Sequence, residues 1–139
     1  MKNFTLDERL ANDCIILGKL NICLLLLMNN SLVPWFILVP ETTESEIIDL
    51  SHSEQEILLK EINLVSRFVR DNFDCKKLNT AAIGNIVSQL HIHIVGRNPA
   101  DYCWPNVVWG TKEKQVYLDS QVNEITNLIK NKLGNLITI

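Results

Sequence analysis

The sequence has little that favours a secreted, membrane-bound or nucleic-acid-binding protein. Its four cysteines form no Cys-x-x-Cys pair and nothing near its start resembles a signal peptide, so we expect a reducing, cytoplasmic location. The most apolar stretch, residues 22–28, is about a third of the length that crosses a bilayer, so it predicts a buried strand and no membrane contact. The 13 basic residues are scattered and the net charge is −3, which disfavours DNA or RNA but leaves a mononucleotide or dinucleotide as a partner.

The composition is typical of a packed globular chain. Hydrophobic residues make up 47% of the 139 positions and charged residues 21%. A chain of this length buries roughly two thirds of the surface that it exposes when unfolded, so it requires neither disulfides nor a structural metal. No repeat, low-complexity segment or linker divides it. We therefore expect a single domain over residues 1–139, with a core at about residues 14–110.

Five segments have the length and composition of strands. Apolar runs occupy residues 14–20, 22–28 and 35–39, and the polar segments between them favour tight reversals, which predicts an antiparallel meander. Two more strands are predicted at residues 78–83 and 89–95. They are separated by Gly84 and Asn85, a dipeptide that tolerates a positive φ.

Two helices are predicted. The first begins at Ser51 or Ser53, each followed three residues later by a glutamate in capping-box position, and ends near Phe73. Its predicted buried stripe comprises Leu58, Ile62, Val65 and Val69, and the residues predicted to stay outside are Lys60, Glu61, Arg67 and Arg70. The second covers about residues 118–133, with Asp119 or Ser120 as its cap and Gly134 as its stop. Its predicted buried stripe comprises Val122, Ile125, Ile129 and Leu133.

The predicted strand at residues 89–95 concentrates polar side chains on one face. Side chains alternate along a strand, so Gln89, His91 and His93 point the same way. A neutral imidazole is a good nucleophile near pH 7, which makes the pair a candidate for phosphoryl or nucleotidyl transfer. Two other interpretations stay open: simple solvent exposure, or a metal site. The latter needs a third ligand that no Asp, Glu or Cys supplies, so we expect no metal or other cofactor.

These residues resemble the strand of the histidine-triad (HIT) family, in which three histidines alternate with apolar residues. Residues 89–95 match it, with Gln89 in place of the first histidine. Residues 26–29 and 35–40 are similar to the family's paired strands. Downstream, Trp104-Pro105 and residues 108–110 resemble a bacterial branch that tends to carry Gln at the first triad position. The resemblance spans about residues 14–110 and implies an α+β fold: a five-stranded antiparallel sheet with a packed helix, here followed by the C-terminal helix.

The resemblance also implies a function. Family members bind purine nucleotides and cleave them at the α-phosphorus through a nucleotidyl-histidine intermediate. In this chain His91 would be the nucleophile, His93 would support the site by hydrogen bonding, and Gln89 would donate an amide hydrogen to a phosphate or bridging oxygen. Many members also carry a histidine shortly after the Pro that corresponds to Pro40, and this chain has none there. A neutral amide in place of an acid is expected to cost about 10²- to 10⁴-fold in rate.

Four further residues are expected by position to contact the nucleotide: Asn29, Asn79, Asn85 and Ser88. Asn29 would hold the ribose, although a turn-forming role is equally compatible with it, and Asn85 also suits a turn. Arg97 has two interpretations, pairing with phosphate or lying on the surface at a strand end, and the second is preferred. The remaining candidates are Trp104 and Trp109, for which packing is favoured over base stacking, and His52, for which a capping or solvated role is expected.

The resulting hypothesis is a hydrolase of a dinucleoside polyphosphate or a nucleoside phosphoramidate. The alternative is a nucleotide-binding module with little or no turnover. A transferase is less favoured, because the nucleotidyltransferase branch has Gln at the last triad position, where this chain has His93. A homodimer is expected from the resemblance and from the apolar residues around Val107, Val108 and Trp109.

Overall fold

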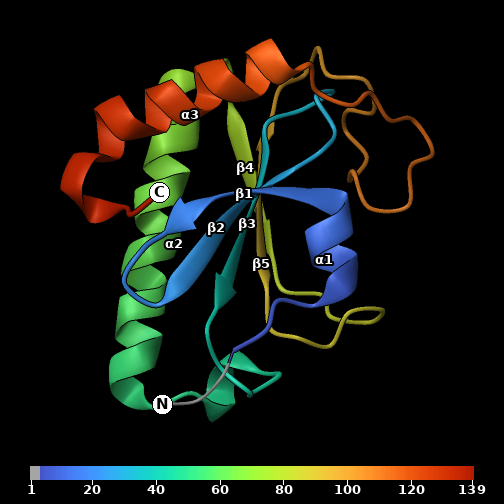
Figure 1. Ribbon diagram of the computed structural model, residues 1–139. Helices are drawn as coiled ribbons and strands as arrows, with labels where there is room; N and C mark the ends of the chain where they lie inside the picture. The colour runs from blue at the N-terminus through green and yellow to red at the C-terminus, as the bar shows by residue number, and fades with distance from the viewer. Residues whose placement is uncertain (1–3) are drawn as a thin grey trace.

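A five-stranded antiparallel sheet forms the centre of the computed structural model, which describes residues 4–139. Its strand order is β1-β2-β3-β5-β4. Helices α2 and α3 lie on one side of the sheet and α1 lies on the other (Figure 1). The predicted α+β fold, a five-stranded antiparallel sheet with a packed helix and a C-terminal helix, is confirmed.

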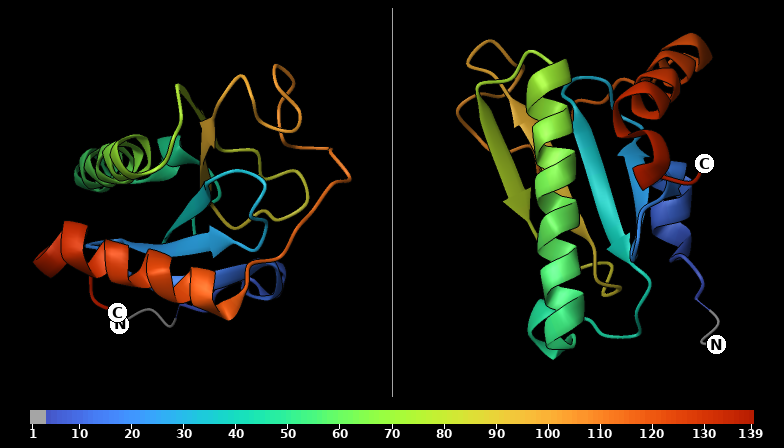
Figure 2. Two further views of the ribbon diagram at one scale, coloured as in Figure 1. Left: turned by 90° about the horizontal axis from the view of Figure 1, so that it is seen from above. Right: turned by 90° about the vertical axis from the view of Figure 1, so that its left-hand side faces the viewer.

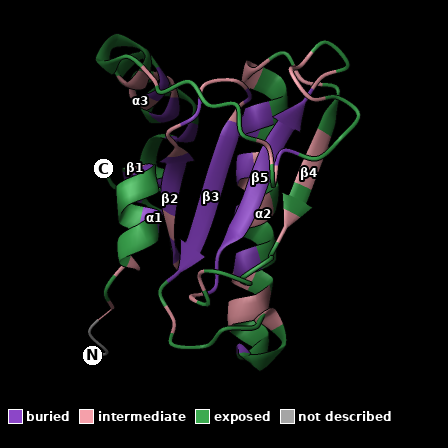
Figure 3. Ribbon diagram, turned by 90° about the vertical axis from the view of Figure 1, so that its right-hand side faces the viewer, coloured by how far each residue is buried: buried purple, intermediate pink, exposed green. Residues whose placement is uncertain are grey.

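The first three strands form the predicted meander: β1 (Cys14–Lys19), β2 (Cys23–Met28) and β3 (Trp35–Pro40). Strand β5 (Ile92–Arg97) then pairs with β3 on one side and with β4 (Lys77–Ala81) on the other. Every residue of β3 and β5 is buried, as the purple strands in Figure 3 show. The sheet is therefore covered on both faces at its centre.

Helix α2 (His52–Asn72) begins where the sequence predicted. The Ser51 side chain accepts from the Glu54 backbone N–H and the Glu54 side chain accepts from the Ser51 backbone N–H, which completes the expected capping box. The prediction that Glu61 faces solvent is wrong, because this residue is buried with 5% of its surface exposed. Its carboxylate accepts hydrogen bonds from three backbone N–H groups of the β1–β2 turn, those of Asn21, Ile22 and Cys23.

Helix α3 (Asp119–Leu133) follows the predicted bounds and packs on the same side of the sheet as α2 (Figure 2). Gly134 ends it with φ +52, a left-handed conformation that suits glycine. The N-cap is Leu118 and not the predicted Asp119 or Ser120. The Leu118 backbone N–H donates a hydrogen bond to the Gln121 side chain. Beyond α3, Thr138 bridges to Lys19 of β1, so the end of the chain adds to that edge of the sheet.

Helix α1 (Glu8–Asp13) was not predicted. The Asp7 side chain caps it by accepting from the Arg9 backbone N–H, and Leu10 is its buried residue. The helix precedes β1 directly and lies on the face of the sheet opposite α2 (Figures 1 and 3). A short 3-10 turn, Ile47–Asp49, leads into α2, and another, Gly134–Leu136, follows α3.

The two faces of the sheet carry separate cores. Alternate residues of each strand contribute to each core, for example Phe36 and Leu38 to the α2 side and Ile37 and Val39 to the α1 side. The four cysteines are all free thiols. Over residues 4–139 no helix is long and apolar enough to cross a membrane.

Candidate active site

The two histidines of the predicted catalytic strand meet on the α1 side of the sheet. Their ring centroids lie 4.9 Å apart at an interplanar angle of 67°, and each residue is 6% exposed. The strand itself is shorter than predicted: β5 begins at Ile92, so Gln89 and His91 precede it. The β3 ladder reaches β5 only as far as Ile92, which leaves the residues before it without a strand partner.

The ring of His91 is oriented by a main-chain group. Its Nδ1 atom lies 2.7 Å from the carbonyl oxygen of Gln89. A carbonyl oxygen can only accept a hydrogen bond, so Nδ1 carries the proton and donates. The lone pair of His91 is therefore on Nε2, the atom that a nucleophilic imidazole uses.

The ring of His93 has the opposite tautomer. The indole N–H of Trp35 donates to Nδ1 of His93 at 3.0 Å, so the proton of His93 is on Nε2. Burial, reinforced by the neighbouring His91, lowers the pKa of His93 from 6.5 to about 4. His93 is thus a neutral hydrogen-bond donor at physiological pH.

Trp109 completes an aromatic cluster around His93. Its ring packs edge-on against Trp35 at 6.1 Å and against His93 at 5.4 Å. Its indole N–H is buried and has no hydrogen-bond acceptor among the residues that the structure describes. The packing role expected for Trp109 is confirmed, and the ring that it packs on is the site's own imidazole.

A cavity of about 550 Å³ opens beside the two histidines. One wall comes from α1, with Arg9, Leu10 and Asp13, and another comes from residues 83–87. The remaining wall is residues 108–114, which include Trp109, Lys112 and Lys114. The cavity is thus lined by apolar rings near the imidazoles and by three cationic side chains, with Asp13 and Glu113 as the acidic ones.

The structure places the other predicted site residues at different distances from this cavity. Asn85 lines it, next to Gly84, whose φ of +68 confirms the expected turn. Ser88 and Gln89 line a neighbouring depression that also reaches His91. Asn29 and Asn79 do not line the cavity: their side-chain oxygens accept from the Tyr117 backbone N–H and from the Arg97 guanidinium.

Arg97 contradicts the prediction that it lies on the surface, because it is 1% exposed. Its guanidinium forms two hydrogen bonds to Asp101, at 2.7 and 3.1 Å, and others to Asn79 and to the Asn106 carbonyl. Burial alone would raise the pKa of Asp101, but hydrogen bonds from Arg97 and from the Asn98 and Cys103 backbone lower it to about 2. This ion pair organises the loop that carries Trp109 to His93.

Neither His52 nor Trp104 lines the cavity. His52 is exposed at the start of α2, as expected. Trp104 is 38% exposed and lies over the Arg97 guanidinium at 5.6 Å. Over residues 4–139 no three His, Cys, Asp or Glu side chains are grouped as a metal would require.

Sequence reasoning missed Trp35, Arg9 and the two lysines of the cavity. Trp35 was assigned to an apolar strand, and only its position on the same strand face as Ile37, the residue opposite His93, would have indicated the contact. Arg9, Lys112 and Lys114 come from opposite ends of the chain, and no local pattern relates them to the histidines.

Comparison with known proteins places this site in a family context. The HIT domain model matches residues 9–100. A histidine triad protein from Marinobacter aquaeolei is 38% identical with a TM-score of 0.91, over 96% of this chain and 98% of that one. Those from Sinorhizobium meliloti and Bradyrhizobium japonicum are each 37% identical over 93% of this chain, covering 96% and 97% of their own, with TM-scores of 0.90 and 0.89. No curated protein matches the chain.

Proposed function

The chain belongs to the HIT domain family, whose members are generally nucleotide hydrolases or transferases, and from this premise we propose that it is a nucleotide hydrolase. It would cleave at the α-phosphorus of a nucleoside phosphoramidate or a dinucleoside polyphosphate. The observation that carries the proposal is the tautomer of His91, whose Nδ1–H is held by the Gln89 carbonyl, so that the lone pair of the ring is on Nε2.

The reaction has two steps. In the first, Nε2 of His91 attacks the α-phosphorus, an N–P bond forms, and the bond from phosphorus to the leaving nitrogen or oxygen breaks with its electron pair. The leaving group takes a proton from solvent, because Gln89 is not an acid. In the second step water attacks the nucleotidyl-histidine, which releases a nucleoside monophosphate and regenerates the free Nε2.

His93 would stabilise the charge that develops on the phosphoryl group. Trp35 fixes its proton on Nε2, and its low pKa keeps the ring neutral, so it presents one oriented N–H and no competing nucleophile. A fixed donor in a water-poor site is worth more than the same donor in water. Trp35 and Trp109 would hold this donor in place by packing on its ring.

The cavity would hold a purine nucleotide. Its volume of about 550 Å³ lies within the range of small-molecule sites, and its apolar walls suit a base and a ribose. Arg9, Lys112 and Lys114 would attract the phosphates, with Asn85 as a further polar contact. No metal or cofactor enters this proposal.

A second candidate function is nucleotide binding with little or no turnover. It is favoured by one observation: the residue at the first triad position, Gln89, cannot supply a proton to the leaving group. Incubation with adenosine 5′-phosphoramidate, and separately with diadenosine tetraphosphate, distinguishes the two functions. Release of adenosine monophosphate at many turnovers per protein supports the hydrolase, whereas saturable binding without product supports the binding module.

We also infer that the protein acts as a cytoplasmic homodimer. Val107 is 53% exposed and Val116 57%, next to the loop that builds the site. Val108, which was expected to add to this apolar surface, is instead buried in the protein's own core. Light scattering should give twice the mass of the 15.9 kDa chain, and a particle of 15.9 kDa would contradict a dimer.

A further inference from the structure

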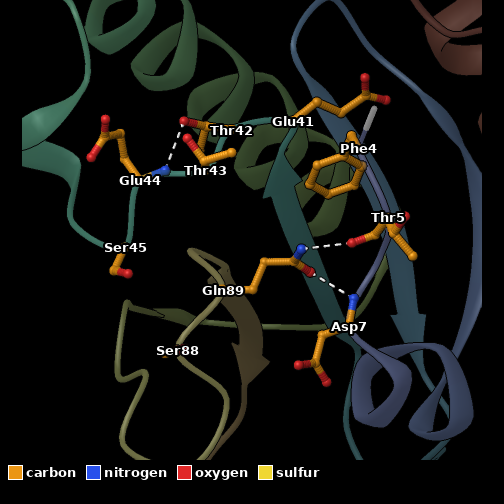
Figure 4. Close-up of a pocket in the computed structure, with 10 residues that line it drawn as sticks. All are labelled: Phe4, Thr5, Asp7, Glu41, Thr42, Thr43, Glu44, Ser45, Ser88 and Gln89. Carbon is orange, nitrogen blue, oxygen red and sulfur yellow. Dashed lines mark hydrogen bonds between the residues drawn. The ribbon is translucent and has the colours of Figure 1, made fainter. Parts of the chain in front are cut away.

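The side chain of Gln89 is attached to the N-terminal segment of the protein. Its Oε1 atom accepts from the Asp7 backbone N–H at 2.8 Å, and its Nε2 atom donates to the Thr5 carbonyl oxygen at 2.9 Å (Figure 4). The two backbone groups fix the orientation of the amide, because a carbonyl requires a donor and an N–H requires an acceptor. We refer to these two hydrogen bonds as the Gln89 clamp.

The same residue orients the nucleophile through its main chain. The Gln89 carbonyl oxygen accepts from Nδ1–H of His91 at 2.7 Å. Gln89 lies outside β5, so no strand ladder holds this carbonyl in place. Among the described residues, the side chain of Gln89 is attached to the rest of the protein by the clamp. The clamp joins Gln89 to residues that precede it by 82 and 84 positions in the sequence.

The segment held by the clamp leads directly into a wall of the cavity. Asp7 is the N-cap of α1, and Arg9 and Leu10 of this helix line the cavity. Arg9 also donates to the Ile86 carbonyl at 3.0 Å, which ties α1 to the opposite wall. The N-terminal end of α1 is thus attached at two points, to Gln89 through the N-cap and to Ile86 through Arg9.

We propose that Gln89 is a positioning residue: its side-chain amide clamps residues 5–7, and this attachment holds both the carbonyl that orients His91 and the α1 wall of the cavity. Its effect on turnover rests on the proposed function, whereas its effect on the His91 tautomer does not. An amide suits this role because it offers a donor and an acceptor on neighbouring atoms. A carboxylate offers no donor to Thr5 and would face its carbonyl with a negative charge.

The first test compares Gln89→Glu with Glu44→Gln. Glu44 lines a second depression together with Thr5, Asp7 and Gln89 but forms no hydrogen bond to these three residues, so its substitution controls for a change of one unit of charge at this place (Figure 4). We expect Gln89→Glu to lower kcat about 10- to 100-fold with KM changed by less than about threefold, because a misplaced nucleophile slows the reacting step. Glu44→Gln should leave both constants unchanged.

The second test removes the clamp from its other side. Asp7 has a φ of −53, which proline can adopt, so Asp7→Pro removes the N–H that Gln89 accepts. Asp7→Ala is the matched control, because it loses the helix cap but keeps the N–H. We expect Asp7→Pro to lower kcat beyond Asp7→Ala by the same factor as Gln89→Glu. The double variant Asp7→Pro/Gln89→Glu should be no slower than the slower single variant.

The third test reads the tautomer of His91 directly. Nitrogen NMR of the wild type should show the proton of His91 on Nδ1, and Gln89→Glu should give a mixture of both tautomers. This readout does not depend on activity, so it tests the clamp even if no nucleotide is turned over and the proposed function fails. An unchanged tautomer together with unchanged kcat, or fully additive effects of the two single variants, would overturn the proposal.

Discussion

The acid stability of the protein should depend on His93 more than on any exposed histidine. Its ring is 6% exposed and accepts a hydrogen bond from the Trp35 indole on Nδ1, so protonation would place a charge in the apolar core of the site and break that bond. Burial and the nearby His91 lower its pKa to about 4. Lowering the pH from 7 to 4 therefore protonates this side chain, and a variant without it separates its contribution from those of the other titrating groups.

The magnitude follows from the two pKa values. In the unfolded chain the pKa of His93 is 6.5, and in the folded protein it is about 4. One pKa unit corresponds to about 1.36 kcal/mol, so the difference amounts to about 3 kcal/mol of unfolding free energy. The sign follows from proton binding: between pH 6.5 and 4 the unfolded state binds the proton that the folded state does not. The stabilisation is complete above pH 6.5 and is lost as the pH falls to about 4.

Urea unfolding at pH 7, 6, 5 and 4 measures this loss. His93→Asn is the control, because the Asn side-chain oxygen can accept from Trp35 but the residue does not titrate. We expect the wild type to lose about 3 kcal/mol more than His93→Asn over this range. Parallel curves for the two proteins would refute the assignment of a neutral, buried His93.

Three other substitutions have expected outcomes. Glu61→Ala should lower the free energy of unfolding by about 3 kcal/mol, measured in urea, because three backbone N–H groups of the β1–β2 turn lose their acceptor. A loss below about 1 kcal/mol would contradict this role of Glu61. Asp101→Ala should cost about 3–5 kcal/mol, because it leaves the buried Arg97 guanidinium unpaired, and wild-type stability would show that water replaces the carboxylate. His52→Ala should change neither stability nor turnover, and any loss of activity would place this exposed residue in a site that the structure does not show.

The elements that the sequence predicted well are those fixed by local chemistry. The capping box at Ser51 and Glu54 starts α2 through contacts within one turn, and Gly134 ends α3 through its own backbone conformation. The strands of the meander are apolar runs separated by short polar turns. In each case the signal lies within a few residues of the feature, so no knowledge of the tertiary structure is needed.

Glu61 and Arg97 were misplaced because their partners are remote or unspecified in the sequence. Glu61 lies three residues after Leu58 and four before Val65, which puts it on the buried stripe, but its backbone partners are about 40 residues away in the β1–β2 turn. Arg97 pairs with Asp101, and nothing local indicates that the chain folds both into the interior. A charged residue type by itself predicts exposure, which is wrong wherever the fold supplies a complete set of partners.

The candidate site was predictable in part. The alternation at residues 89–93 indicated that His91 and His93 share a face, and their rings do meet. The same alternation suggested that the strand begins at Gln89, but a strand requires a partner, and the ladder to β3 ends at Ile92. The tautomer of His93 depends on Trp35, and the α1 wall is attached through Thr5 and Asp7, residues that only the tertiary structure brings near the site.

The central claim is that His91 attacks the α-phosphorus, and intact-mass analysis after rapid quenching of the protein with adenosine 5′-phosphoramidate tests it most directly. The wild type should gain the mass of one adenylyl group, and His91→Ala should show neither this adduct nor turnover while its affinity for adenosine monophosphate changes little. His93→Ala should still form the adduct, more slowly, because it loses a donor and not the attacking atom. Full turnover by His91→Ala, or an adenylyl group found on another residue, would contradict the account.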